Sequence, residues 1–215
     1  DPRLDWLGMA LIVVASASLT YAVIDGESLG WSSPLILGLL GTAAAGLVAF
    51  YFVERRRPNA LMPPRLFRNR TFTSANLAGL LLFFGLVGVT FLLPLFLQGQ
   101  LELSAVRTGI LLTPLSGMIM IVGPISGRMT DRWGGRWLIV SGITVAAVGV
   151  YLLSRIEIPL DVPYLLAALG IAGLGIGLAM APTTSVVMGS VEPGRIGNAS
   201  GILGTFRMMG AVLGV

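Results

Sequence analysis

Residues 123–137, GPISGRMTDRWGGRW, place charged side chains in an otherwise apolar part of the chain. The stretch holds one Asp, three Arg and four Gly. Asp131 has arginines nearby with which to pair, and a carboxylate beside a helix N-terminus is stabilised by the helix dipole. Such a polar cluster can hold one conformation and release in another, so it predicts a conformational switch.

Glycine and proline in the same stretch bear on helix packing. Gly123 and Gly127 are four residues apart and share one helical face, on which a neighbouring backbone can come close. Pro124 is expected to kink or loosen the preceding turn. A tight turn through Gly134 and Gly135 is predicted to reverse the chain.

Arg207 is the one charge that we place inside an apolar segment. It lies 12 residues after Arg195, about 18 Å of helix rise. A charged side chain inside the membrane has a high energetic cost, so a functional role is the first hypothesis for it. Arg207 could contact an anionic partner or a carboxylate outside this chain; alternatively, its long side chain snorkels to the membrane surface. We favour the functional role.

Several kinds of chemistry are excluded. The chain has no His and no Cys, which removes disulfides, thiol nucleophiles, imidazole bases and the usual zinc sites. The sequence contains no P-loop, nucleotide fingerprint or pair of catalytic carboxylates, and no Asp or Glu lies within an apolar segment. We expect no cofactor, no metal and no enzymatic activity.

The composition is that of a membrane protein. Of 215 residues, 55% are hydrophobic and 11% charged, whereas about a quarter of a soluble domain is charged. All 14 basic residues are Arg, scattered at the ends of apolar runs. The formal charge of +4 therefore does not indicate a nucleic-acid surface.

Seven apolar segments approach the roughly 20 residues that a bilayer-spanning helix needs. Helix is the necessary structure, because a lone strand or loop would leave backbone groups unpaired in lipid. The sequence thus predicts an all-α bundle of transmembrane helices. The expected spans are 6–24, 35–53, 73–97, 108–127, 137–154, 163–182 and 196–215.

The arginines predict the orientation of these spans. Eleven lie on alternate links, and the opposite links hold Arg107 and Arg155 alone. By the positive-inside rule, the N-terminus, 54–72, 128–136 and 183–195 are cytoplasmic. The eleven are Arg3, Arg55, Arg56, Arg57, Arg65, Arg68, Arg70, Arg128, Arg132, Arg136 and Arg195.

The longest cytoplasmic link, 54–72, divides the chain into a pair of helices, 1–53, and five helices, 73–215. Pro58, Pro63 and Pro64 prevent a continuous helix through it. Its arginines could bind anionic lipids, but we favour their role as an orientation signal.

The first stretch resembles the cytoplasmic-loop signature of the major facilitator superfamily, G-x-x-x-D-R-x-G-[RK]-[RK]. Gly135 stands where a basic residue is usual. Segments 91–114 and 198–215 are similar to fourteen-spanning drug/proton antiporters of that superfamily. The signature positions are Gly127, Asp131, Arg132, Gly134 and Arg136.

The resemblance implies a partial fold of that superfamily. Residues 1–53 would be the extra central helix pair, and 73–215 the first five helices of the C-terminal half. The N-terminal half and the last helix would be missing, so the fragment is not expected to transport alone. The full-length protein would move a small molecule by rocking of its halves, with protons, across a plasma membrane such as a bacterial inner membrane.

The resemblance also places the helix 73–97 beside the central cavity. Asn76, Phe91, Gln98 and Arg207 become candidates for substrate contact, and the aromatic and amide groups suit bulky apolar or cationic drugs. Alternatively, any single Phe faces lipid, which we favour, and Gln98 is interfacial. Proton-carrying carboxylates are expected in the missing half.

Four further glycines have the spacing of close helix contacts. Gly173 and Gly177 lie in LGIAGLGIGLAMAP and would serve either static packing or a sliding surface, which the sequence leaves open. Gly210 and Gly214 repeat the spacing near the C-terminal end.

Two other function classes remain open. A metabolite or siderophore carrier of the same superfamily would share the loop signature, with a more polar, charge-bearing cavity. A non-transporting membrane scaffold or sensor would carry an appended soluble domain or a long ordered loop.

Overall fold

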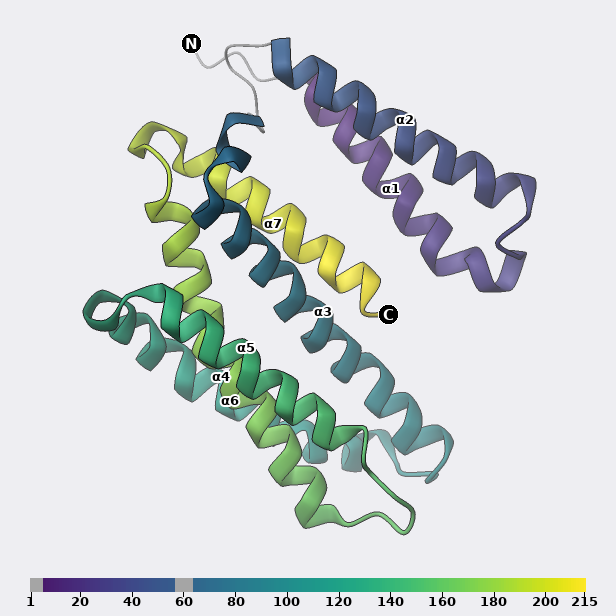
Figure 1. Ribbon diagram of the computed structural model, residues 1–215. Helices are drawn as coiled ribbons and strands as arrows, with labels where there is room; N and C mark the ends of the chain where they lie inside the picture. The colour runs from purple at the N-terminus through teal and green to yellow at the C-terminus, as the bar shows by residue number, and fades with distance from the viewer. Residues whose placement is uncertain (1–5, 57–63) are drawn as a thin grey trace. The chain divides into compact units, whose positions relative to one another are not determined.

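The computed structural model describes residues 6–56 and 64–215, which form helices joined by short turns without a strand (Figure 1). This confirms the predicted all-α class. Arg3, Arg57, Pro58, Pro63 and part of the expected link 54–72 lie outside the described residues. The helices are α1 (Trp6–Leu29), α2 (Pro34–Arg56), α3 (Arg70–Gly99), α4 (Ala105–Trp133), α5 (Gly135–Leu153), α6 (Val162–Gly189) and α7 (Ile196–Leu213), with 3-10 turns η1 (Pro64–Arg68) and η2 (Pro193–Arg195).

Six of the described helices, α1 to α6, are long and apolar enough to cross a membrane. Seven spans were predicted, and α7 is the one that does not qualify. It has 18 residues, and Asn198 and Arg207 lie among them. These two polar residues lower its mean hydropathy.

Several helices continue beyond the predicted spans. α4 ends at Trp133 rather than at 127, and α6 passes Pro182 to reach Gly189. A hydropathy pattern ends where charged residues begin, whereas a helix ends where a residue breaks its backbone. Proline is tolerated within membrane helices because neighbouring groups satisfy the freed carbonyl.

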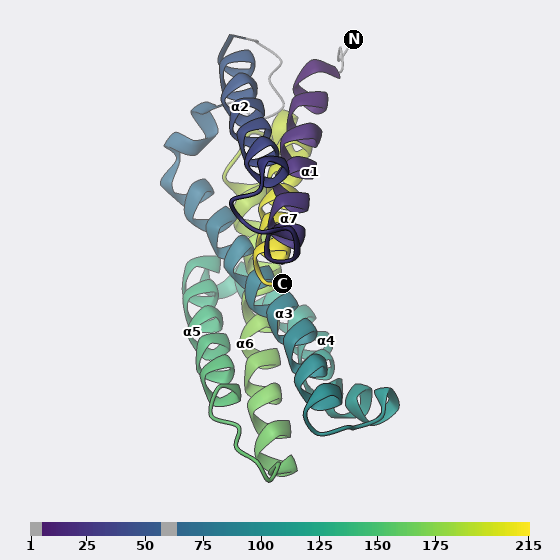
Figure 2. The same ribbon diagram turned by 90° about the vertical axis from the view of Figure 1, so that its right-hand side faces the viewer.

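The chain forms two compact units, Asp1–Thr73 and Ser74–Val215. In the first, α1 and α2 make an antiparallel hairpin (Figures 1 and 2). Small residues let the two helices come close: a Cβ at Gly46 would lie 3.0 Å from the Cβ of Ala15. The ring of Trp31 packs at the turn, 2.9 Å from where a Cβ of Gly26 would be.

In the second unit α6 is the central helix. Half of the residues in its most apolar stretch are buried, whereas 17–28% are buried in the corresponding stretches of the other five spans. α5 packs on one face of α6, where three α5 glycines each two turns apart, Gly135, Gly142 and Gly149, meet α6. α4 packs on another face, and α7 lies beside α3 (Figure 1).

The link between α5 and α6 is held by side chains at its two ends. Asp161 Oδ1 accepts a hydrogen bond from the Tyr164 backbone N–H at 3.2 Å and so caps α6. The Tyr164 hydroxyl donates to the Leu152 carbonyl at 2.9 Å, near the end of α5. These bonds satisfy helix-end groups that would otherwise be unpaired.

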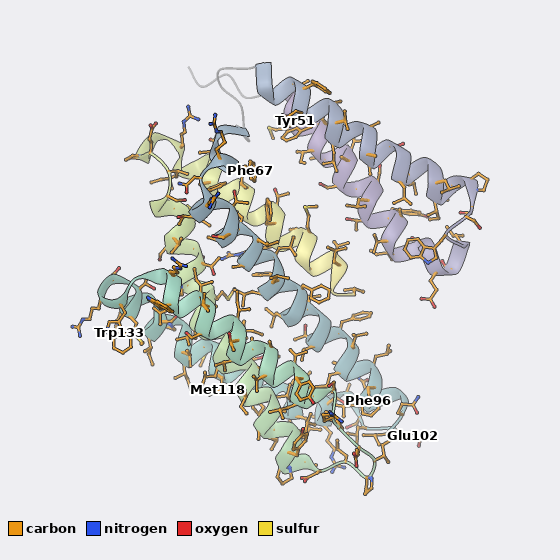
Figure 3. All side chains as sticks on the ribbon, in the orientation of Figure 1. Tyr51, Phe67, Phe96, Glu102, Met118 and Trp133 are labelled. Atoms are coloured by element: carbon orange, nitrogen blue, oxygen red, sulfur yellow. The ribbon has the colours of Figure 1, made fainter. Side chains whose placement is uncertain are left out.

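The outer faces of the second unit are apolar. Leu95, Ile110 and Met120 are 64%, 64% and 75% exposed, and side chains of this kind cover the helices in Figure 3. A surface of this composition is suited to lipid, as the sequence predicts.

Substituting Gly175 should weaken the α5–α6 contact. A Cβ there would lie 2.6 Å from the Gly142 carbonyl oxygen and 2.7 Å from the Ala146 Cα, both backbone atoms. We expect Gly175→Ala to lower the free energy of unfolding by about 1–3 kcal/mol, as overpacking does. Unfolding of the full-length protein by SDS in mixed micelles measures this change.

Gly170→Ala is the matched control on the same helix. No neighbouring atom lies within 4 Å of a Cβ at Gly170, so Ala there should be neutral or stabilise by up to about 1 kcal/mol. Equal effects of the two substitutions would contradict the described packing.

Candidate functional site

A single residue, Gly134, joins α4 to α5. Its φ of 78° and ψ of 141° lie in a region that favours glycine. Its N–H donates to the Thr130 carbonyl at 3.0 Å. The turn is therefore tighter than the predicted reversal through two glycines, because Gly135 is already the first residue of α5.

Gly135 has a steric reason to lack a side chain. It is buried, and a Cβ at this position would collide with Val186 Cγ2 of α6 and lie 3.5 Å from the Pro182 carbonyl oxygen. A basic residue, usual at this point of the loop signature, would have to displace α6. The departure from the signature thus follows from the close approach of α5 and α6.

Asp131 is exposed in the last turn of α4. Within the described residues it forms no ion pair with Arg128, Arg132 or Arg136; the ion pair found there joins Arg195 and Glu192 at 4.0 Å. No side chain caps the start of α5. The expected pairing and dipole contact are therefore not formed: Asp131 lies at a helix C-terminus, where the dipole favours cations such as Arg132.

The contact between α4 and α6 includes a hydrogen bond from Ser126, a residue that no sequence pattern singled out. Its hydroxyl is fully buried and lies 3.0 Å from the Gly177 carbonyl oxygen and 2.9 Å from that of Gly123. Gly123 has no neighbour within 4 Å of a Cβ, and Gly127 has only Ala181 Cβ at 3.7 Å. Pro124, between Gly123 and Ser126, is exposed within α4.

The other predicted packing glycines lie at helix crossings. A Cβ at Gly173 would collide with the Leu115 carbonyl oxygen of α4, and one at Gly177 would lie 3.1 Å from the Ile119 Cα. Gly210 of α7 lies against the Leu80 carbonyl, and Gly214, directly after α7, lies against that of Phe84; both carbonyls are on α3. These four positions thus bring α6 close to α4 and α7 close to α3.

Arg207 has neighbours from two other helices. Its Nη2 donates to the Thr184 Oγ1 of α6 at 2.6 Å, and its Cζ lies 5.3 Å from the centroid of the Phe83 ring of α3. Its Nε is buried and has no hydrogen-bond partner. The sequence predicted a role for Arg207 but did not identify Thr184, because nothing in a sequence pairs two helices.

The remaining cavity candidates lie apart from one another along α3. Asn76 is completely buried, Phe91 is 48% exposed, and Gln98 is exposed near the end of the helix. None of them lines the apolar cavity of about 470 Å³ between α3 and α5. That cavity is lined by residues that include Phe84, Gly88, Leu92, Phe96, Val150 and Ser154.

The two ends of the second unit differ in their exposed side chains. Figure 3 shows Trp133 at the α4–α5 turn, and Phe96 and Glu102 at the far end of α3. Trp133 and Trp137 are 70% and 73% exposed and flank the turn together with exposed Arg132 and Arg136. Tryptophan and arginine are the residues that commonly anchor helix ends at a membrane interface.

Comparison with known protein families identifies the family of this chain. The family model of the Major Facilitator Superfamily matches residues 6–215. The chain belongs to the major facilitator superfamily. This membership agrees with the all-α bundle and with the loop signature at 127–136.

Relatives in this superfamily carry names of drug transport and resistance. The chain is 34% identical over 212 residues to the multidrug resistance protein Stp of Mycobacterium tuberculosis, and 33% over 214 residues to the multidrug transporter protein MdtP of Bacillus subtilis. It is 37% identical over 220 residues to the puromycin resistance protein pur8 of Streptomyces alboniger. These alignments cover 99%, 98% and 99% of this chain but 39%, 39% and 43% of the relatives, so the chain spans about two fifths of their length.

Adding one methyl group at Gly135 should destabilise the protein. We expect Gly135→Ala to lower the free energy of unfolding by about 1–3 kcal/mol through its collision with Val186. Val186→Ala should recover part of this loss in the double variant. SDS unfolding of the full-length protein and a double-mutant cycle give the coupling.

Gly127→Ala is the control within the same loop signature, because its Cβ would meet only Ala181 Cβ at an ordinary 3.7 Å. It should leave the stability within about 0.5 kcal/mol of the parent. Absence of coupling between positions 135 and 186 would show that the crossing is not as described.

Proposed function

We propose that the full-length protein is a secondary active transporter that exports drugs or other bulky apolar or cationic compounds, and that this export is coupled to the movement of protons. The observation that carries this proposal is the alignment of nearly the whole chain with relatives named for multidrug transport and antibiotic resistance. The described helices support it, because six of them are of membrane-spanning length and the outer faces of the second unit are apolar.

In this proposal the chain supplies part of a fourteen-spanning carrier. Residues 1–53 are the extra central helix pair, and 73–215 are the first five helices of the C-terminal half, joined by 54–72. The N-terminal half and the last helix belong to other parts of the protein. The share of the relatives' length that aligns, about two fifths, is compatible with this layout.

The orientation proposed from the arginines has a consequence for the α4–α5 turn. The turn at Gly134 and the turn η2 would be cytoplasmic, together with the exposed side chains of Arg128, Arg132, Arg136 and Arg195. A plasma membrane, such as a bacterial inner membrane, provides the potential and the proton gradient that an antiporter of this kind uses.

Asp131 is proposed as the acidic member of a conformational switch. It is exposed and has no ion-pair partner within residues 74–215. Its partner in one transport state would be a cation or a helix N-terminus in the part of the carrier beyond this chain. That contact would be lost in the other state, so it would stabilise one of the two states between which alternating access switches.

The substrate path is proposed along α3. Phe91 offers an exposed aromatic face and Gln98 an exposed amide, the groups suited to apolar or cationic molecules. Asn76 is completely buried and would act through the packing of α3 rather than by direct contact. The acidic residues of the described helices all lie in the last two turns of those helices, so the proton-carrying carboxylates are proposed to lie elsewhere in the protein.

If Asp131 is part of the switch, its substitution should reduce transport and leave membrane insertion unchanged. In the full-length carrier, Asp131→Asn should reduce efflux by about fivefold or more, the low end of the coupling between linked states. Membrane insertion should stay unchanged, because the side chain is exposed and unpaired in the described state. Dye efflux from energised cells and immunoblots of membrane fractions measure the two quantities.

Glu157→Gln provides the matched control. Glu157 is an exposed acid in the link between α5 and α6, on the membrane face opposite to Asp131 in the proposed topology. Its substitution should leave efflux unchanged. Equal efflux by the parent and the Asp131→Asn carrier would remove Asp131 from the mechanism.

The transport function itself is tested by resistance profiling. Cells that express the full-length gene should tolerate higher concentrations of several unrelated drugs, and a protonophore should abolish the advantage. Growth protection confined to one metabolite, or none, would contradict the proposal.

A further inference from the structure

The place of Arg207 in the second unit is set by close contacts between helices. α3 approaches α7 at Gly79, where a Cβ would lie 2.8 Å from Leu203 Cδ1 and 3.8 Å from Arg207 Cγ. One turn later on α3, the Phe83 ring lies over the guanidinium at 5.3 Å. On α7 itself, Gly210 lies one turn after Arg207 and meets the Leu80 carbonyl. Glycines on both helices thus bring an aromatic ring to an arginine.

The hydrogen bonds of this guanidinium are incomplete. Nη2 donates to Thr184 Oγ1 at 2.6 Å. That hydroxyl lies 3.2 Å from the Met180 carbonyl, to which it donates, so it is oriented to accept from Arg207. Nε is buried and has no hydrogen-bond partner. The planar fork of N–H donors therefore has one hydrogen bond, to a neutral oxygen, and no other acceptor among the described residues of the second unit.

No carboxylate neutralises Arg207 within the second unit. No acidic side chain there lies within 4.0 Å of it. The acids of the described helices and links lie near helix ends or outside the helices, and an uncompensated cation in the interior of a membrane bundle is rare. In the second unit these acids are Glu102, Asp131, Glu157, Asp161 and Glu192.

We propose that Arg207 is the binding point for a carboxylate. The guanidinium fork matches a carboxylate in a two-bond geometry, the Phe83 ring lies 5.3 Å from its Cζ, and the Thr184 hydroxyl bonds one end of it. This inference rests on the proposed function and extends it, because a drug that bears an acid group becomes a substrate alongside apolar and cationic ones. The carboxylate belongs either to the transported molecule or to an acidic side chain of the carrier outside this chain.

A pair of dyes that differ by one group tests the first source. Rhodamine B carries a free carboxylate, and its ethyl ester does not. Affinities of the purified full-length protein for each dye, measured by fluorescence anisotropy in nanodiscs, should favour the acid by about tenfold, the scale expected for a charge-assisted bidentate contact. Arg207→Gln should abolish that preference, and Arg207→Lys should retain part of it because the charge remains.

Arg155→Gln is the matched control for loss of an arginine. Arg155 also lies over an aromatic ring, with its Cζ 5.4 Å from the Tyr151 centroid, and bonds the Tyr151 hydroxyl at 2.9 Å. It stands at an exposed link rather than among packed helices. Its substitution should leave the dye preference unchanged. Thr184→Val, which removes the neutral acceptor only, should weaken binding of the acid without loss of protein in the membrane.

The second source gives a different result. If an acidic side chain of the carrier binds Arg207, the parent shows no preference between the dyes. Arg207→Gln then lowers the melting temperature of the purified carrier, and a second substitution of one Asp or Glu by its amide restores that temperature. If the parent shows no dye preference and no second substitution restores the melting temperature, the proposal is overturned. Arg207 is then an arginine that snorkels to the membrane surface.

Dye transport into vesicles is recorded separately. Acid preference at Arg207 without transport of any tested compound would contradict the proposed function and leave the binding site standing. If drug transport is identical in the parent and Arg207→Gln carriers, and neither the dye preference nor the melting temperature changes, the binding site at Arg207 is contradicted and the proposed function stands.

Discussion

Close contact between helices at small residues is the constraint on which this structure depends. Lipid tails are as apolar as the helix surfaces, so burial of apolar area does not drive membrane helices together as it does in water. Packing must do so, and packing improves when backbones approach closely. α6 shows this most clearly, because Gly175 meets α5 and Gly173 meets α4 on different faces. α6 can be the central helix of its unit only while these positions lack side chains.

The same constraint shapes the groups that could carry function. Gly135 is buried against α6, and this excludes the basic residue that the loop signature favours. The α4–α5 turn is left with exposed Asp131, Arg132 and Arg136 on a single-residue connection. Likewise, the approach of α3 at Gly79 brings Phe83 over Arg207. Polar groups in this bundle are thus positioned by glycines on neighbouring helices rather than by networks of charged residues.

The helices themselves could be predicted from the sequence, since hydropathy and the need to pair backbone groups in lipid are local properties. Their ends were less accessible: α6 continues past Pro182, which reads as a breaker, and α4 continues through Asp131. α7 was expected to be a full span, but its 18 residues include Asn198 and Arg207, and it is not among the six helices that qualify. The contacts between helices could not be predicted. Ser126 and Thr184 acquire their importance from partners 51 and 23 residues away, and a single sequence contains no signal for such pairs.

The orientation of the bundle in the membrane underlies every functional role assigned to its ends, and labelling of single cysteines measures it directly. The chain has no cysteine of its own, so Ser28→Cys, Glu157→Cys and Gly194→Cys can each be introduced into a full-length carrier freed of other cysteines. All three positions are exposed and lie outside the helix cores. With a membrane-impermeant maleimide on intact cells, the account predicts labelling at 28 and 157, and labelling at 194 only after the membrane is opened. Reaction of position 194 from the same side as 28 and 157 would contradict it.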